Sequence, residues 1–446
     1  MTYDEIAAFV LGPIDAPDTS LEMTATLLID TLGVAAGAAD MEAGRIARNH
    51  VVRFQNTAEV GDQATLLFDG RKASITGAAF ALATQIDNLD GHDGYNPTKG
   101  HIGCAVVPAL CAFAEQMPDL TAREALEALA MSYEVAARAA IALHGSVSDY
   151  HTSGAWNALG VAALGCRLRG DDPEVLRHAL GIAEYHGPRS QMMREIATPT
   201  MLHDGSGMGA LVGTMAVLMA EDGFTGAPAI TVEAEEAAEH WADLGRLWTV
   251  ELNYIKPYPI CRWAHAAIDA LGGMLEAHQL SEVDIERIEV RTFAESAELY
   301  AGLPETTSQA QYSLGFALAT RLVHGHIGPE HISGDGLKDK AVAEALAKIS
   351  VTEEPRHSVR FPLGRWSDVT LVLKDGQTLQ SGDVHARGGP ESPMGLDEVE
   401  RKFYNFCAAL PEARRRAIWA ARARLLEPDA KFSELLTLLF DSGSDT

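Results

Sequence analysis

Apolar residues recur at steps of three and four through most of the chain between about residues 20 and 255. The clearest segments are rich in alanine and cover 20–38, 123–143 and 154–168. This period places the apolar side chains on one face of an α-helix. Gly205, Gly209 and Gly213 also recur at every fourth position, which permits close approach of a neighbouring helix. A large region of tightly packed helices is therefore predicted.

The pattern changes after the segment 253–263, NYIKPYPICRW, where two prolines break any helix. Residues 285–293 then alternate between apolar and polar, and 367–384 read as two strands around an Asp-Gly turn. Helical patterns occupy 308–325 and 339–351 between these strands, and helical periodicity returns from about residue 395.

The predicted fold class is mainly α with an α+β second domain. A large helical domain, 1–256 and 393–446, contains both termini, and a smaller α+β lid domain, 257–392, is inserted between its helices. A C-terminal helical segment that follows an α+β insert is expected to pack back onto the first domain.

Charge and cysteine content narrow the functional classes. The 446 residues carry 35 basic and 62 acidic side chains, a net charge of −27, which repels polyanions and argues against nucleic acid as a partner. A small anionic substrate still fits if the pocket is locally cationic. The five cysteines lack a CxxC pair, so neither a disulfide framework nor a structural zinc site is expected.

The N-terminus and the length of the apolar runs bear on where in the cell the protein is expected. The N-terminus is acidic where a signal peptide needs positive charge, and no apolar run reaches the roughly 18 residues of a membrane span. We therefore expect a cytoplasmic protein that does not enter a membrane.

A charged loop, DNLDGHDGYNPTKGHIG at 87–103, lies between two apolar segments. Three interpretations of this loop are open: a surface loop, a metal site or the lip of a catalytic pocket. The calcium-hand pattern fails, because Leu89 stands at the third position and Thr98 at the twelfth, where a bidentate glutamate is needed. His92 and His101 could bind a transition metal with the aspartates, but their spacing in a loop fixes no geometry. No metal is predicted.

Three further polar segments hold candidate bases and cations. They are SVSDYHTSG at 146–154, EYHGPRSQMMR at 184–194 and the hinge IKPYPICRWAH at 255–265. A histidine or lysine taken singly is more often structural. Ligand sites favour domain junctions such as the hinge, however, and together these segments contain the groups needed to bind a small polycarboxylate and move a proton on it.

At this level of detail the chain resembles the MmgE/PrpD family, which includes 2-methylcitrate dehydratase, cis-aconitate decarboxylase and iminodisuccinate epimerase. The resemblance covers nearly the whole chain. The segments that carry it are DNLD at 87–90, HIGCAVVPA at 101–109, HTSGAWNALG at 151–160, LHDGSGMGALVG at 202–213, GFTGAP at 223–228, KPYPICR at 256–262, LKDGQ at 373–377, SPMG at 392–395 and RKF at 401–403. The KPYPICR match, in register with the others, is specific.

The resemblance implies a helical domain that holds both termini, an inserted α+β lid and an active site in the cleft between them. It also implies that no metal or organic cofactor takes part, that the substrate is a small polycarboxylate and that the protein is a homodimer.

The departures from the family pattern bear on the reaction. Gly91 stands where decarboxylase-like members have threonine, Thr200 where they have lysine, and Phe316 where many have tyrosine; Ile102 replaces a proline. An epimerase demands only two proton-transfer groups on opposite faces of one carbon, so the loss of a lysine and a phenol favours an iminodisuccinate-type epimerase. A hydro-lyase of the 2-methylcitrate dehydratase type is the next alternative, and a non-catalytic dicarboxylate-binding protein is the third.

We assign roles to residues of these segments as hypotheses. His101 or His151 is one base, Lys256 holds a substrate carboxylate or acts as the opposing acid, and Tyr150 donates a proton. Asp87 and Asp90 orient His101, since a carboxylate beside imidazole fixes its tautomer. The predicted catalytic residues are His101, His151, Lys256, Tyr150 and Asp90, and the predicted substrate-binding residues are Asp87, His92, Arg189, His203, Tyr258 and Arg262.

Overall fold

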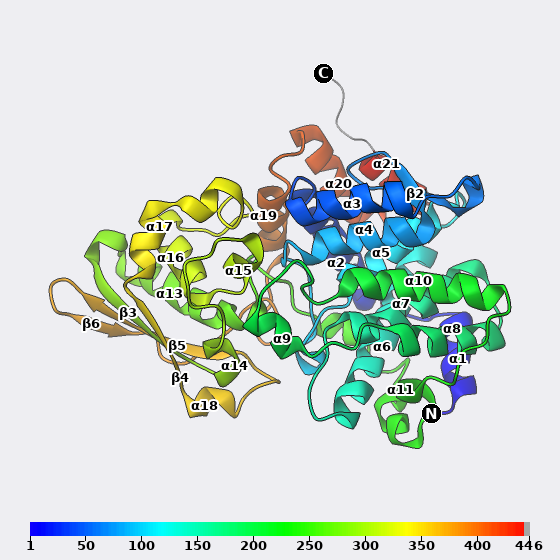
Figure 1. Cartoon of the computed structure of the whole chain (residues 1–446), viewed down its shortest axis with the longest axis horizontal. Coiled ribbons are helices and arrows are strands. Elements are labelled where there is room, and N and C mark those ends of the chain that lie inside the picture. Colours follow the sequence, from blue (N-terminus) through cyan, green and yellow to red (C-terminus); the bar gives the residue numbers. More distant parts are fainter. Residues whose placement is uncertain (441–446) are drawn as a thin grey trace.

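A computed structural model describes residues 1–440 of the chain. Residues 441–446, the end of the predicted helical segment 393–446, lie outside the described residues. Figure 1 shows two lobes side by side, a helical lobe on the right and a lobe containing a β-sheet on the left, which we call the lid lobe. The predicted fold class, mainly α with an α+β part in the C-terminal region, is confirmed. The predicted boundaries at 256–257 and 392–393 stay predictions.

The helical lobe is formed first by the N-terminal half of the chain. Its helices are α1 (Tyr3–Leu11), α2 (Asp18–Gly37), α3 (Glu42–Phe54), α4 (Ile75–Asp87), α5 (Gly103–Ala114), α6 (Ala122–Ser146), α7 (Gly154–Arg169), α8 (Pro173–His186), α9 (Met192–Ala197), α10 (Ser206–Glu221), α11 (Ile230–Glu233) and α12 (Ala238–Trp241). A short hairpin of β1 (Gln63–Thr65) and β2 (Lys72–Ser74) precedes α4.

Glycines let the central helices α7 and α10 approach closely, as the sequence predicts. A Cβ atom at Gly209 would lie 2.1 Å from Asn157 Oδ1, and one at Gly213 would lie 2.5 Å from Val161. Gly205 has a different function, because it precedes α10 with φ of 67°, in the left-handed region that favours glycine. The close approach brings the N-terminal ends of α7 and α10 together.

The lid lobe contains a five-stranded mixed sheet in the order β4-β3-β5-β6, with β7 paired to β5. Its strands are β3 (Ile285–Thr292), β4 (Ile349–Glu353), β5 (Trp366–Leu373), β6 (Thr378–Gln380) and β7 (Val384–His385). β3 pairs with β4 in parallel and with β5 antiparallel. The predicted Asp-Gly turn joins β5 to β6, with Gly376 at φ 89°.

Helices cover this sheet: α13 (His265–His278), α14 (Ala294–Ala297), α15 (Thr307–Gln311), α16 (Leu314–His324), α17 (Lys340–Leu346) and α18 (Pro355–Ser358). The helix predicted over 308–325 is divided into α15 and α16, because the Ser313 side chain accepts from the Phe316 N–H and starts a new helix. The helix predicted over 339–351 ends earlier, and its last residues belong to β4.

The chain returns to the helical lobe in α19 (Leu396–Phe406), α20 (Glu412–Arg424) and α21 (Phe432–Phe440). Helix α19 packs on α2. There Lys402 forms a buried ion pair with Asp30, with 2.6 Å between Nζ and Oδ2. The predicted return of the C-terminal helices onto the first domain is therefore present up to residue 440.

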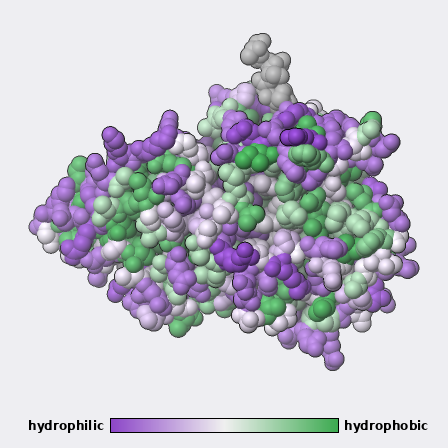
Figure 2. All heavy atoms as spheres, in the orientation of Figure 1, coloured by the Kyte–Doolittle hydropathy of each residue, from purple (hydrophilic) through white to green (hydrophobic). Residues whose placement is uncertain are grey.

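Hydrophobic groups on the surface face drawn in Figure 2 occur on both lobes, between hydrophilic ones. Within residues 1–440, no single helix has both the length and the apolar composition of a membrane span; the bent pair α2 and α3 passes that test only when its two helices are taken together.

Candidate active site

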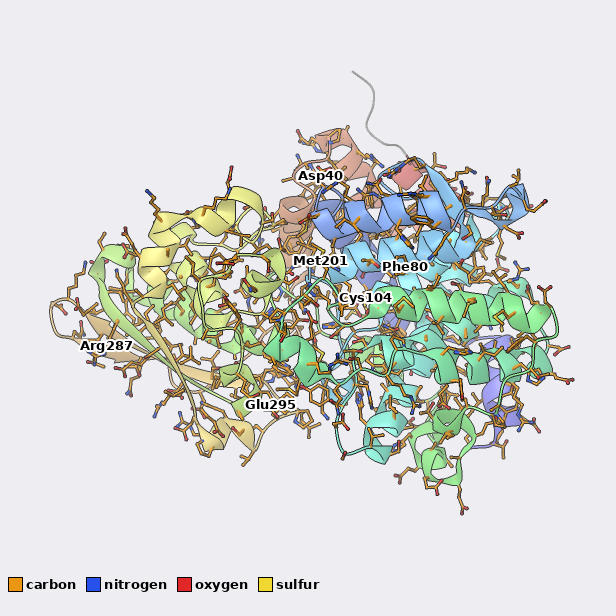
Figure 3. The ribbon with its side chains drawn as sticks, in the orientation of Figure 1. Asp40, Phe80, Cys104, Met201, Arg287 and Glu295 are labelled. Atoms are coloured by element: carbon orange, nitrogen blue, oxygen red, sulfur yellow. The ribbon has the colours of Figure 1, made fainter. Side chains whose placement is uncertain are left out.

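A small pocket lies between the two lobes, and the space it leaves for the centre of a water-sized probe is about 20 Å³. Its lining comes from both lobes and from the hinge: Asp90, Lys99, His101, Met192, Asp204, Tyr254, Lys256, Cys261, Arg262, Trp263, Tyr312 and Arg365. In Figure 3, the labelled Met201 marks the boundary between the lobes, and the labelled Cys104 lies within the helical lobe. The predicted loop at 87–103 contributes three of the lining residues.

The loop is held by hydrogen bonds to both sides of the pocket. Gly94 and Tyr254 exchange backbone hydrogen bonds, 3.1 Å from Gly94 N and 2.8 Å from Tyr254 N. A Cβ atom at Gly94 would lie 2.3 Å from the Tyr254 hydroxyl, so glycine is required for this approach. The Asp93 carboxylate accepts a hydrogen bond of 3.4 Å from the Thr31 hydroxyl of α2. These contacts fix the hinge beside the loop.

Lys256 is fully buried and forms an ion pair with Asp90. Its ammonium also donates to the Asp90 backbone carbonyl at 3.1 Å, and Asp90 has φ of 56°. Burial disfavours a charge on Lys256, but the neighbouring Asp90 outweighs this and raises the lysine pKa. Lys256 is therefore a permanent cation in the wall of the pocket.

His101 is oriented as a base. Its Nδ1 lies 2.6 Å from the Asp93 carbonyl, which can only accept, so Nδ1 carries the proton and the lone pair lies on Nε2. Nε2 lies 3.5 Å from Asp204 Oδ2. Burial and the charge of Lys256 lower the pKa of His101 well below its usual value, so the ring is neutral at neutral pH.

The Asp204 carboxylate lies beside His101 Nε2, whereas the Asp93 carbonyl contacts Nδ1. It directly precedes the Gly205 turn at the start of α10, and its carboxylate accepts a hydrogen bond of 2.7 Å from Ser153 Oγ. Ser153 Oγ also accepts from the His101 backbone N–H at 2.9 Å. Burial raises the pKa of Asp204 to about 6. An ionised Asp204 stabilises the imidazolium that forms when His101 takes a proton.

His92 and Asp87 form a buried layer behind His101. The rings of His92 and His101 meet edge to face at 4.4 Å, and His92 Nε2 lies 3.8 Å from Asp87 Oδ1. Asp87 accepts from the Ser206 N–H at 3.1 Å. Asp87 and Asp90 were expected to orient His101, but its hydrogen-bond and ion-pair partners are Asp93 and Asp204.

Metal-ligating atoms converge here: single atoms of Asp90, His92 and His101 lie within 4.8 Å of one another. The Lys256 ammonium, however, is bound to the same Asp90 carboxylate. A divalent cation at this position would meet a fixed positive charge, so the arrangement fits a lysine-carboxylate pair better than a metal ion.

Two buried arginines add positive charge to the lid wall of the pocket. Arg262 donates to the backbone carbonyls of Arg387 and Ala386, at 2.5 and 2.9 Å, and lies over the Tyr254 ring. Arg365 donates to the Pro362 carbonyl. The Nε atoms of both arginines are buried and have no hydrogen-bond partner among residues 1–440. Unpaired buried donors are costly, so a bound carboxylate that accepts from them would be stabilised.

A tyrosine from the lid also lines the pocket. Tyr312, the residue between α15 and α16, is buried, and its ring lies 5.4 Å from that of His203. Burial raises its pKa, so it stays a neutral donor. Phe316, which occupies the expected tyrosine position, is one turn away in the hydrophobic core. Tyr312 therefore supplies a phenol to the pocket, in place of the tyrosine expected at position 316.

The two parts of the chain match two family models. Residues 4–243 match the MmgE/PrpD N-terminal domain, and residues 258–426 match the MmgE/PrpD C-terminal domain. The chain belongs to the MmgE/PrpD family. No curated protein matches the chain. The family includes isomerases and lyases, so membership supports an enzyme of the dehydratase or epimerase type.

The other residues predicted from the MmgE/PrpD resemblance lie outside the pocket lining. Tyr150 donates to Met193 Sδ at 3.5 Å, and Lys99 lies over its ring. The His151 backbone N–H donates to His144. Arg189 is exposed, and the Tyr258 hydroxyl donates to Asp269 at 2.9 Å. His203 is buried beside Tyr312 without lining the pocket.

Several residues of the site were not found from sequence. Asp204, Tyr254, Tyr312 and Arg365 line the pocket, and Ser153 donates to Asp204 from outside the lining. Asp204 carries a usable signal, since it directly follows the Leu-His pair of the MmgE/PrpD pattern. Tyr254 stands two residues before the KPYPICR motif. Arg365 has no local signal, because only the folding of the lid brings residue 365 to the hinge.

The Gly91 departure from the MmgE/PrpD pattern has a steric reason. A Cβ atom at Gly91 would lie 2.3 Å from Phe406 Cε2, so the α19 phenylalanine occupies the space of a side chain. We expect Gly91→Thr to lower the free energy of unfolding by about 1–3 kcal/mol through overpacking. Urea unfolding measures this. The double variant Gly91→Thr/Phe406→Ala should lose less stability than the two single changes summed; simple additivity would contradict the steric reason.

Proposed function

We propose that this protein is a cofactor-independent enzyme that removes the proton α to a carboxylate of a small di- or tricarboxylate. The observation that carries the proposal is one pocket in which a neutral histidine base, His101, faces a buried ammonium, Lys256, and two arginines with unpaired donors. A carbanion-like intermediate beside a carboxylate needs a base and fixed positive charge, and both are present.

The charge balance of the pocket supports an anionic substrate on an acidic protein. Four cations line it, Lys99, Lys256, Arg262 and Arg365, against two carboxylates. One of those carboxylates is already paired with Lys256.

Epimerisation is our first choice of reaction. In this proposal His101 removes the proton from one face of the α-carbon, Lys256 and the arginines stabilise the negative charge, and a lid group returns a proton to the other face. Tyr312 is suited to that second role, because it belongs to the opposite lobe and its raised pKa keeps it protonated. An iminodisuccinate-like dicarboxylate is the proposed substrate class.

A hydro-lyase of the 2-methylcitrate dehydratase type is the second candidate, and one observation favours it. The phenol of Tyr312 supplies an acid that could protonate a leaving hydroxyl. The absence of tyrosine at 316 is therefore a weaker argument against dehydration than the sequence alone suggests.

Proton NMR in D₂O distinguishes the candidates. We expect iminodisuccinate enantiomers to become deuterated at the α-carbon and to interconvert without new vinyl signals. Vinyl signals from 2-methylcitrate would establish the hydro-lyase instead. Binding of a dicarboxylate without any deuterium exchange would contradict both and indicate a non-catalytic binding protein.

The pH dependence of turnover follows from Asp204. Because the pKa of Asp204 is raised to about 6, its carboxylate is ionised above that pH and neutral below it. Only the ionised form stabilises a His101 imidazolium, so kcat/KM should rise with pH and level off above about pH 6–7. In Asp204→Asn this step should disappear, and the plateau should fall by about tenfold or more. An unchanged step in the variant would contradict this role; the buried Asp93, whose pKa is also about 6, would then be the titrating group.

A further inference from the structure

Three histidines converge on the surface of the lid lobe, at the end of α16. His324 is the last residue of that helix, and His326 and His331 follow in the loop. The His331 ring stacks on His324 at 4.5 Å and meets His326 edge to face at 4.7 Å. None of these residues lines the pocket between the lobes. Three imidazoles at such distances would repel one another if protonated. Their proximity therefore favours neutral rings, the form in which histidine binds a metal ion.

Glu330 completes the group. Its Oε1 lies 3.2 Å from His326 Nε2 and 3.3 Å from His331 Nδ1, and the three ligand atoms lie within 4.8 Å of one another. Two ligand atoms held 2.0–2.1 Å from a tetrahedral metal ion lie about 3.3–3.4 Å apart. The two separations, 3.2 and 3.3 Å, match adjacent corners of a zinc coordination tetrahedron.

The hydrogen bonds around the two rings indicate which nitrogen atom of each is unprotonated. His326 Nδ1 lies 3.1 Å from the His324 carbonyl, so it carries the proton and Nε2 is free. His331 Nδ1 accepts from the Gly328 N–H at 3.0 Å and is also unprotonated. The His326 Nε2 lone pair thus faces the Glu330 carboxylate oxygen, whereas the His331 Nδ1 lone pair is taken up by Gly328. A cation between the three groups would relieve the repulsion at His326 and Glu330, and it would replace the bond from Gly328 at His331.

The surrounding residues hold the group in place. His324 Nε2 donates to Asp339 at 2.9 Å, and Asp339 caps α17. Ser333 Oγ donates to the Pro329 carbonyl at 2.8 Å and closes the turn that carries Glu330. Outer contacts of this kind orient metal ligands.

No Lys or Arg competes for Glu330, whose ion-pair partners among residues 1–440 are His326 and His331. A second group with converging ligand atoms in the lid lobe, His357 with Asp368 and Asp383, differs. There Arg356 and Arg360 already neutralise the carboxylates.

We propose that His326, Glu330 and His331 form a surface site for a zinc-class divalent ion on the lid lobe. The side chains of His326 and Glu330 are 58% and 59% exposed, so water can occupy the fourth position. Imidazole and carboxylate ligands suit Zn²⁺ and related ions. The site joins the end of α16 to the following loop and is separate from the proposed reaction.

Zinc binding to the full-length, chelator-treated protein tests this site. We expect isothermal titration with ZnCl₂ to give one saturable site per chain, and Co²⁺ to give the visible absorption of a tetrahedral complex. His326→Ala and Glu330→Gln should each weaken binding at least about tenfold. Both side chains are exposed, so circular dichroism should be unchanged.

The matched control is His186→Ala, which removes an exposed histidine from the helical lobe. It should bind zinc like the original protein. Unchanged affinity in His326→Ala and Glu330→Gln would overturn the proposal and move the site elsewhere, for example to the buried Asp87, His92 and Cys104 group. Equal weakening in the control, or no saturable binding at all, would also overturn it.

Discussion

Lys256→Met should lower kcat/KM by about 10³-fold. The ammonium comes from the hinge between the lobes, lines the pocket and is fully buried. Fixed charge in such a site stabilises a developing carbanion without reorganisation, and removing one electrostatic group typically costs 10²–10³-fold, with more lost when the group also transfers a proton. Steady-state kinetics on the substrate identified by NMR measures the effect.

Stability is the competing explanation for such a loss. The substitution leaves Asp90 buried without its partner, which costs about 3–5 kcal/mol unless the carboxylate takes up a proton. Lys402→Met is the matched control, because it breaks the other fully buried lysine-aspartate pair, with Asp30, outside the pocket. We expect the two variants to lose similar stability in urea unfolding, while Lys402→Met keeps its turnover. Equal loss of activity in both would assign the effect to folding.

His101→Gln should abolish α-proton exchange, with a loss of about 10²–10⁴-fold. Glutamine retains a side-chain donor for the Asp93 carbonyl but has no lone pair of comparable basicity at the Nε2 position. Substrate binding should change little, since the cations that hold the carboxylates remain. Deuterium incorporation measured by NMR, together with a binding isotherm, separates the two effects.

A second histidine provides the control for His101. His178→Gln replaces a partly buried histidine of α8 whose ring contacts the Gly226 backbone, outside the pocket. Its exchange rate should equal that of the original protein. If His101→Gln keeps its exchange rate, another group is the base, and His151 becomes the next candidate to substitute.

Local sequence pattern determined the architecture well. Helical spacing predicted the long helices, and strand alternation predicted β3 and the hairpin of β5 and β6, because each depends on which residues share a face within one element. The two prolines of KPYPICR marked the hinge, since proline cannot continue a helix. Boundaries were less accurate where a cap intervened: the Ser313 hydroxyl, not the apolar pattern, divides 308–325 into two helices.

The motifs also determined part of the pocket. His101, Lys256, Asp90 and Arg262 were predicted from the charged loop and the hinge, and all four line the pocket. These segments are adjacent because Gly94 and Tyr254 form a backbone bridge, which requires the bare Cα of glycine. The family resemblance guided this part of the prediction, since glycine spacing by itself does not name a partner strand.

Only the tertiary structure decided the rest. It brings Asp204 to His101, Tyr312 to the lid wall and Arg365 to the hinge, and it leaves Tyr150, His151 and Arg189 outside the lining. The surface group of His326, Glu330 and His331 likewise depends on how one loop folds against the end of α16. A local pattern indicates which face of an element is buried. Which distant side chains then meet depends on how the two lobes pack together. Residues 90 and 365 line the same pocket only because of those long-range contacts.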